Sequence, residues 1–575
     1  MRVNASLLFF LIVSLASGLR AQQVSVQEYA LQNGMKLLMV PRKGDPNIAA
    51  GWVARVGSVN ERPGITGISH LFEHMMFKGT HAIGTTDINK DLEIMARMDA
   101  VKAELRKKEE EQNRRLRLGE ISDLTDPKNR SPRHQQLLDE FAGLEKQEKD
   151  LLVKNEFDKI YTAAGASGMN AFTERDLTVY FINVPANKIE LWFWMESDRL
   201  LNPVFREFYS ERDVVREERR LRTESTPTGK FEEEFESTFW VASPYQWPVV
   251  GWPSDLEGIT REEALAYFAV NYAPNNISAC LVGDFDPAQA RALADRYFGR
   301  LKRNPQGQPP VRTREVEHLA EKRMIAFAET NPEVEIRYPS TADGHKDEPA
   351  LVVLGSLLTG RTGRLYKSLV LEQKIANSVS GGQNGLKWEG YFELSGVAKP
   401  GSAPEQVEQA LYKEVEKLQK EKVSERELQK VKNGFAADNF RRLQKNFSLM
   451  LQLLLAESNR GWQSFNEDPR KIDDVTAGDI QRVANQYFKP EKRAVALYYT
   501  KKAAPGEEDP LLTGLNDEEK AQVRELKNAL ARMPVEQARL LLQQVQQQEG
   551  SAPPEKKQFL QTVKTLVQEK IGGKP

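Results

Sequence analysis

The chain has 575 residues, too many for a single hydrophobic core, so we expect two to four domains. Hydrophobic residues make up 40% of it and charged residues 28%, a composition typical of globular proteins. The net charge of −1 argues against a nucleic-acid-binding protein that works by neutralising phosphates.

The N-terminus has the pattern of a secretory signal peptide. Arg2 precedes an apolar run at residues 5–16, and small residues follow, with cleavage expected after Gly18 or Ala21. The run is too short to span a membrane comfortably, and no other apolar stretch is long enough. We therefore predict a signal peptide at residues 1–21 and an exported mature protein with no stable membrane insertion.

The only cysteine, Cys280, cannot form an intramolecular disulfide. It stands in the apolar run ISACLVGDF, which favours a buried strand residue over a reactive thiol. A signal peptide without disulfides suits the bacterial periplasm, which is the location we expect.

Hydrophobic periodicity predicts a mixture of strands and helices, an α+β arrangement. We expect a hairpin within residues 24–57 around the turn at Asn33-Gly34. The other predicted elements are a helix at 65–78, a strand at 177–184, a helix at 187–202, and a charged helix at 210–224 with Ser210 as N-cap and Asp213 at its N3 position.

Residues 100–160 differ from their surroundings in being dense in Lys, Glu, Arg and Gln, with Leu at helical spacing. A break between Asp126 and Pro132 predicts two antiparallel helices that project from the domain as a hairpin. Two interpretations remain open: a solvated insertion without function, or a lid or partner-docking arm.

An internal repeat relates the segment that starts at Ile259 to the one that starts at Val475. In both, a Thr opens a helix, a Tyr closes it and a Pro precedes an apolar strand. Such a long spacing indicates a duplicated domain rather than a solenoid, whose repeats are roughly 20–50 residues. We predict two homologous α/β-sandwich domains, with the helical-hairpin insertion in the first and a helical C-terminal tail, at residues 22–310, 311–500 and 501–575.

The pentapeptide His70-Leu71-Phe72-Glu73-His74 is the clearest chemical signal. On a helix the two histidines lie on one face, where they can take two corners of a zinc tetrahedron. Glu73 lies on the same face and can move a proton between a water molecule and the leaving amine. This H-x-x-E-H order inverts the commoner H-E-x-x-H motif.

A catalytic zinc site needs a third protein ligand and keeps one position open. The remaining four histidines are scattered among polar residues, so a carboxylate is the better choice. The charged helix offers Glu211, Glu217 and Glu218, and composition alone does not choose between them.

Four segments together are similar to the pitrilysin/insulinase family of zinc metallopeptidases, the inverted zincins. They are GSVNERPGITGISHLFEHMMFKGT from Gly57, NAFTERDLTVYFINVP from Asn170, ERDVVREE from Glu211 and NYAPNNISACLVGDFDP from Asn271. The chain most resembles the two-domain branch that includes mitochondrial processing peptidase, over roughly residues 25–500.

The resemblance implies one zinc ion per chain, held by the residues that match the family's ligands: His70, His74 and Glu218. Glu73 matches the catalytic base, and Glu211 matches a supporting glutamate that orients the site. Asn170 and Ala171 match an edge strand that pairs with the backbone of the substrate.

One departure from the family pattern concerns the second domain. Active single-chain members carry an Arg and, seven residues on, a Tyr, which reach the substrate carbonyl region. Those places fall at Val370 and Asn377 here, while Arg364 and Tyr366 stand at the wrong spacing. The resemblance therefore implies a partner subunit of the same fold that lacks zinc ligands but supplies the Arg and Tyr, in a closed chamber that favours unfolded peptides.

The function predicted from the sequence is an exported zinc-dependent endopeptidase subunit. The alternative is a non-catalytic member that acts as a binding or assembly subunit, which the missing Arg and Tyr favour and the intact zinc motif opposes. A secreted coiled-coil adaptor would leave both the repeat and the zinc motif unexplained.

Overall fold

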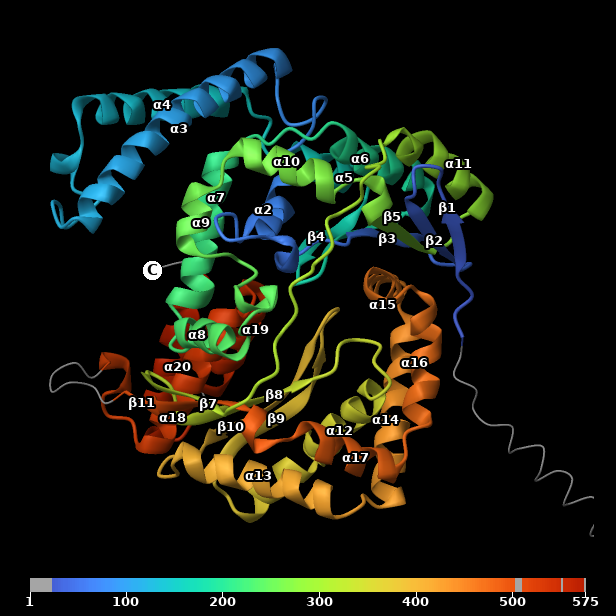
Figure 1. Ribbon diagram of the computed structural model, residues 1–575, viewed down its shortest axis with the longest axis vertical. Coiled ribbons are helices and arrows are strands. Elements are labelled where there is room, and N and C mark those ends of the chain that lie inside the picture. The colour runs from blue at the N-terminus through green and yellow to red at the C-terminus, as the bar shows by residue number, and fades with distance from the viewer. Residues whose placement is uncertain (1–22, 502–508, 550–551, 573–575) are drawn as a thin grey trace, which may run out of the picture.

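The computed structural model describes residues 23–501, 509–549 and 552–572, so the predicted signal peptide lies outside the described residues. Two β-sheets face one another across the middle of the molecule, each with helices on its outer side (Figure 1). In the described part of the chain, no helix has both the length and the apolar character needed to cross a lipid bilayer.

The first sheet has six strands, in the spatial order β1 (Gln27–Ala30), β2 (Lys36–Pro41), β6 (Ile277–Gly283), β3 (Asn47–Ala54), β5 (Thr178–Pro185) and β4 (Ser167–Thr173). The predicted hairpin is confirmed for β1 and β2, and Gly34 has the positive φ of 91° that its turn needs. The edge strand β4 is left with one backbone side unpaired within the sheet.

The second sheet has five strands, in the order β7 (Lys322–Ala328), β11 (Ala494–Thr500), β8 (Glu333–Ser340), β10 (Gly390–Ala398) and β9 (Ala376–Gly385). Both sheets contain one parallel pair, β2 with β6 and β7 with β11, followed by antiparallel strands. Without β1, the first sheet repeats the order of the second, which confirms the predicted α+β fold of two homologous units.

The sequence repeat forms the same structure in both halves. Thr260 accepts a hydrogen bond from the backbone of Glu263 at the start of α10 (Arg261–Asn271), and Glu263 bonds back to the backbone of Thr260. Thr476 and Asp479 make the same capping box at the start of α17 (Ala477–Tyr487). Each helix leads through a proline turn into a buried strand, β6 or β11.

The helices of the first half pack on the outer face of the first sheet and form the largest core of the molecule. They are α2 (Ile68–Met75), α5 (Glu156–Ala163), α6 (Ile189–Leu201), α7 (Phe208–Arg219), α9 (Pro253–Gly258), α10 and α11 (Pro287–Tyr297). Between α2 and α5, the helices α3 (Ile88–Arg117) and α4 (Pro132–Leu151) form a hairpin that projects from the body (Figure 1).

The second half contributes α12 (Glu348–Leu358), α13 (Pro404–Lys420), α14 (Glu425–Gln444), α15 (Asn446–Asn459) and α16 (Gln463–Asp473), besides α17. Its helix α15 crosses to the first sheet, where Met450 and Leu453 pack against the inner face together with Cys280. Cys280 is a buried strand residue, as predicted. Conversely, Phe235 and Phe239 of α8 (Gly229–Phe239) pack on the second sheet, so each sheet is covered by a helix from the other half.

The C-terminal tail forms three helices with a small core of their own: α18 (Asp517–Arg532), α19 (Val535–Glu549) and α20 (Pro554–Gly572). They lie beside α8, on the side of the molecule opposite α15 (Figure 1). Asn528 of α18 donates to Thr330, and Asn331 donates to the Ala521 carbonyl, so the tail is fastened to the loop before β8.

The predicted N-cap at Ser210 is wrong. Helix α7 begins at Phe208, after Glu207 in the left-handed conformation with φ 53°. Ser210 therefore lies within the first turn, where its hydroxyl donates to the Glu207 carbonyl instead of accepting from the helix backbone. At its other end α7 continues into a π-helical turn, η5 (Arg220–Glu224).

Candidate metal centre and peptide cavity

Helix α2 is held by a buried carboxylate at its N-terminus. Glu61 accepts hydrogen bonds from the backbone N–H groups of Gly67 and Ser69, both at 2.8 Å. Gly67 has φ 88°, and a Cβ there would stand 2.5 Å from the Val250 carbonyl, so the entry into the helix needs glycine. Burial raises the pKa of Glu61 to about 8 in spite of the two N–H donors. These contacts set the position of the helix that carries His70.

Helix α7 packs against α2 and brings Glu218 to the two histidines. Glu218 Oε1 lies 3.6 Å from His70 Nε2, and Glu218 Oε2 lies 3.3 Å from His74 Nε2. The imidazole rings are 5.1 Å apart at an interplanar angle of 86°. Of the three carboxylates that the sequence left open, Glu218 is thus the one that meets both histidines. Glu217 instead points outward and pairs with Arg220.

The donor set fits a zinc ion. One ligand atom from each of His70, His74 and Glu218 can be chosen so that all lie within 4.8 Å of one another. Zn–N and Zn–O bonds of about 2.0–2.1 Å in a tetrahedron put ligand atoms about 3.3–3.4 Å apart, close to the two separations found here. Across the described ranges, no other group of three or more His, Cys, Asp or Glu side chains has this geometry. The assignment of these residues as zinc ligands stays a prediction.

Glu211 lies behind His74 rather than at the metal position. Its Oε2 is 3.4 Å from His74 Nδ1, and it also forms an ion pair with Lys78. A carboxylate on the far nitrogen of a ligand histidine fixes the ring orientation and its tautomer. Glu211 therefore lies where the predicted orienting glutamate should be.

Burial and local charge set the ionisation of the cluster. Burial lowers the pKa of His70 to about 4, which leaves its imidazole neutral, as metal binding requires. Burial opposes ionisation of Glu218, but contacts with His74, His70 and Arg222 outweigh it and lower its pKa to about 2. Burial likewise opposes the charged form of His74, yet contacts with Glu211 and Glu218 raise its pKa to about 9.

Glu73, the predicted general base, is largely buried beside the cluster. Burial raises the pKa of its carboxyl, while Thr173 and His74 exert smaller opposing effects. Thr173 belongs to β4, so Glu73 lies between the cluster of His70, His74 and Glu218 and the edge strand. A carboxyl with a raised pKa is suited to accept a proton and give it back near neutral pH.

Asn170 and Ala171 lie on β4, at the free edge of the first sheet. Asn170 is exposed and Ala171 is buried, and they pair with Phe181 and Tyr180 of β5 on the other side of the strand. Because β4 also contacts α2, an added strand at this edge would run past Glu73 and the histidines.

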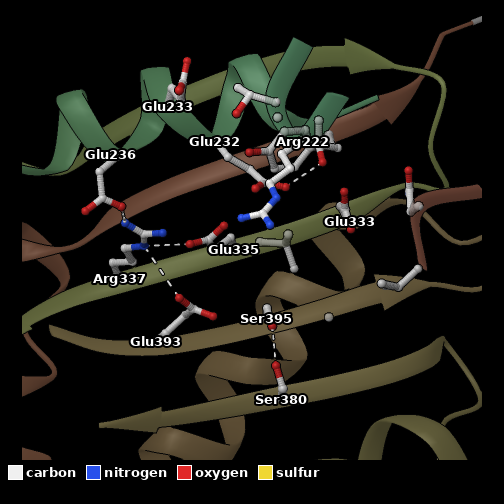
Figure 2. Close-up of a pocket in the computed structure, with 18 of the residues that line it drawn as sticks. Arg222, Glu232, Glu233, Glu236, Glu333, Glu335, Arg337, Ser380, Glu393 and Ser395 are labelled. Atoms are coloured by element: carbon white, nitrogen blue, oxygen red, sulfur yellow. Dashed lines mark hydrogen bonds and ion pairs between the residues drawn. The ribbon is translucent and has the colours of Figure 1, made fainter. Parts of the chain in front are cut away.

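A cavity of about 730 Å³ opens between the two halves next to this cluster. Its walls come from η5 and α8 on one side and from β8, β9 and β10 on the other, and Asn528 of the tail also lines it. Figure 2 shows Arg337 linking Glu236, Glu335 and Glu393 across the wall, while Arg222 lies near α8 above the strands. Sequence analysis did not single out Arg222, although it follows Glu218 by one helical turn.

The second half places no Arg or Tyr at the two positions where the family pattern has them. Val370 lies in the π-helical turn η9 (Tyr366–Glu372) and packs against the second core, and Asn377 lies on β9. Arg364 is engaged by two hydrogen bonds of 2.7 Å with Glu427 of α14. It is therefore held on the helical side of the second sheet.

Two family models match the chain. The model described as "Insulinase (Peptidase family M16)" matches residues 39–107, and the one described as "Peptidase M16 inactive domain" matches residues 258–435. These two matches support membership of the insulinase (M16) family of peptidases. The first match contains α2 and its histidines, and the second covers most of the wall that faces them.

Individual members of the M16 family support this assignment. The chain is 26% identical over 491 residues to "Zinc protease PqqE" of Helicobacter pylori, which covers 83% of this chain and 94% of that protein. It is 26% identical over 139 residues to "Probable mitochondrial-processing peptidase subunit beta" of Schizosaccharomyces pombe, covering 23% of this chain and 30% of that one.

A solved structure shares the fold. It is the crystal structure of a protease from Helicobacter pylori, with a TM-score of 0.68 and 23% sequence identity. The match covers 83% of this chain and the whole of that one.

Proposed function

We propose that this chain is a zinc-dependent endopeptidase subunit that is exported by its signal peptide and located in the periplasm. The observation that carries the proposal is the meeting of His70, His74 and Glu218 from two helices, with Glu73 beside them. A ligand set of this kind with an adjacent carboxyl base is typical of metal-assisted peptide hydrolysis.

The chemistry assigned to the chain's own residues is proton transfer and orientation. A zinc ion bound by the three ligands would supply Lewis-acid activation of water and of the peptide carbonyl. Glu73 accepts a proton from the attacking water while the oxygen of that water bonds to the carbonyl carbon. Glu73 then gives the proton to the amide nitrogen as the C–N bond breaks. Glu211 holds His74 in the orientation that the ligand needs.

The substrate class that fits this site is an extended peptide. The free edge of β4 offers backbone hydrogen bonds to a strand of any sequence, and the cavity lies between two packed halves. A folded protein cannot present an extended strand in such a space, so unfolded segments are preferred.

We also propose a second subunit of the same fold. Because Val370 and Asn377 stand where the family pattern has an Arg and a Tyr, the chain lacks the hydrogen bonds that those two side chains would donate to the substrate. Arg364 cannot replace them, since it is bonded to Glu427. The similarity to a protein that is itself named as a subunit supports this arrangement. Donors aimed at the carbonyl oxygen of the reacting bond are among the largest contributions to catalysis.

The test is to purify the mature chain and measure its zinc content and its cleavage of an unstructured peptide, beside Glu73→Gln. We expect about one zinc per chain in both proteins and little cleavage by the wild type alone, because the second subunit is missing. The cleavage that the wild type does show should fall by about 10²–10⁴-fold in Glu73→Gln. Zinc without cleavage in the wild type directs the search to the partner subunit. A chain that binds no zinc under any condition contradicts the proposal.

The alternative function is a non-catalytic binding or assembly subunit. It is favoured by the absence of Arg and Tyr at Val370 and Asn377, and by the match of residues 258–435 to the domain described as inactive. A scaffold has no use for Glu73. Wild type and Glu73→Gln that behave alike in the presence of every candidate partner would favour this alternative.

A further inference from the structure

Three functional side chains lie along one face of α7 and its extension. Glu211 and Glu218 are seven residues apart, and Arg222 follows four residues later, in the π-helical turn η5. Residues at these spacings share a helical face. The face therefore runs from Glu211 behind His74, past Glu218 at the metal cluster, to Arg222 at the cavity. Single π-helical turns occur often at functional sites.

Arg222 faces the cavity although one of its nitrogens is engaged. Its Nη1 donates to Glu218 Oε1 at 2.8 Å, yet 72% of its side chain remains exposed. Since a guanidinium carries five N–H donors, most of them are free to meet a ligand in the cavity that Arg222 lines. In Figure 2 its side chain lies across the pocket from the strands of the second sheet.

Arg220, in the same turn, forms an ordinary surface ion pair and serves as a comparison for Arg222. It makes two hydrogen bonds to Glu217, at 2.7 and 2.9 Å, and it does not line the cavity. Its partner is 54% exposed, whereas the partner of Arg222 is 19% exposed and lies at the metal cluster. A solvated ion pair thus accounts for Arg220 but not for Arg222.

The charge of Arg222 reaches the whole cluster. It lowers the pKa of His70, of Glu73 and of Glu218, in each case as a smaller effect beside burial. A cation that acts on both the predicted base and two predicted ligands lies close to the space where a bound peptide would react. Its position also makes it an opposite charge for a carbonyl oxygen that becomes more negative there.

We propose that Arg222 is a substrate-binding residue, whose guanidinium donates to a backbone carbonyl oxygen of the peptide held beside the metal cluster, an inference that rests on the proposed peptidase function. The chain thereby supplies one cation of its own, which neither Val370 nor Asn377 can provide. This contact recognises the backbone of the peptide rather than its side chains, in keeping with strand addition at β4. Arg222 keeps its bond to Glu218 through one nitrogen and uses the others for the substrate.

The experiment measures peptide binding rather than turnover, so it does not depend on the partner subunit. Zinc-loaded full-length chain with Glu73→Gln is titrated with a fluorescein-labelled, unstructured peptide with blocked ends, and compared with the double variants that add Arg222→Ala or Arg220→Ala. Zinc content is measured for all three proteins. A second titration uses the same peptide with a free C-terminal carboxylate.

We expect Arg222→Ala to weaken binding of the blocked peptide by at least about tenfold while zinc content stays the same. Arg220→Ala should leave both unchanged. Added guanidinium ion should restore part of the affinity that Arg222→Ala loses, because it can occupy the vacated position.

Four results would overturn the inference. They are unchanged affinity in Arg222→Ala, loss of zinc in step with loss of affinity, a contribution seen only with the free carboxylate, and absence of peptide binding to the Glu73→Gln chain. None of these decides the proposed function, because cleavage by the wild type with and without Glu73 is measured separately.

Discussion

The two halves share one strand order, but the helix after the second shared strand differs sharply between them. In the first half α2 follows β3 and carries His70, Glu73 and His74. In the second half α12 follows β8, contacts the edge strand β9 as α2 contacts β4, and buries only apolar residues and a glycine. A second pair of helices, α7 and α14, differs as well. Glu218 of α7 lies beside the histidines, whereas Glu427 of α14 forms an ion pair with Arg364.

The fold alone therefore does not require the polar cluster. Burial works against the charged forms of His70, Glu73 and Glu218, whereas α12 fills the corresponding place with a packed apolar surface. Groups that are costly to bury and that shift one another's pKa values gather at functional sites. The first half thus carries the polar cluster, and the second half forms the opposite wall of the cavity.

The largest effect is expected from exchanging one glutamate in each half. Glu218→Gln removes the negative charge of the third predicted zinc ligand, which lies beside His70 and His74. We therefore expect bound zinc to fall from about one per chain to nearly none. Glu427→Gln makes the same chemical change on α14 and should leave zinc content unaltered. Metal analysis after dialysis checks both, and equal zinc in the two variants would remove the distinction between the halves.

The second-largest effect is expected on stability, from the packing of α15 between the two halves. Leu453 of α15 is fully buried against the first sheet, so Leu453→Ala should lower the free energy of unfolding by about 2–5 kcal/mol. Thermal unfolding followed by circular dichroism measures the shift. Leu540→Ala in the tail is the matched control, because Leu540 is 61% exposed and should cost little. If both variants melt alike, α15 does not hold the halves together.

A smaller effect is expected behind the metal cluster. Glu211→Gln weakens the contact that orients His74 but keeps all three ligands, so zinc affinity should fall by about 10–100-fold without being abolished. Competition with a coloured chelator gives the affinity. A loss as complete as that of Glu218→Gln would mean that Glu211 is itself a ligand, and an unchanged affinity would mean that it has no orienting role.

The smallest effect tests where the halves are alike. Thr260→Ala and Thr476→Ala each remove one N-cap of the repeated helix, and each should lower the free energy of unfolding by about 1 kcal/mol. Chemical denaturation compares the two variants with wild type. Costs that differ by several-fold would show that the repeat is conserved in shape but not in its energetic role.

Local geometry explains which features could be predicted from the sequence alone. The spacing of His70 and His74 places them on one helical face, Asn33-Gly34 makes a tight turn, and Thr260 and Thr476 start helices whether or not anything packs on them. The repeated helix and strand likewise predicted two units of one fold. These features depend on residues within a few positions of each other, so they can be read along the chain.

Tertiary packing decided the rest. Glu217 and Glu218 are neighbours that point about 100° apart around α7, so only the packing of α7 on α2 determines that Glu218 meets the histidines. The place of Arg222 depends on a π-helical turn and on a cavity wall from the other half of the chain. Contacts between segments far apart in the sequence leave no local pattern, and they are what brings His70, His74 and Glu218 together beside the edge strand β4.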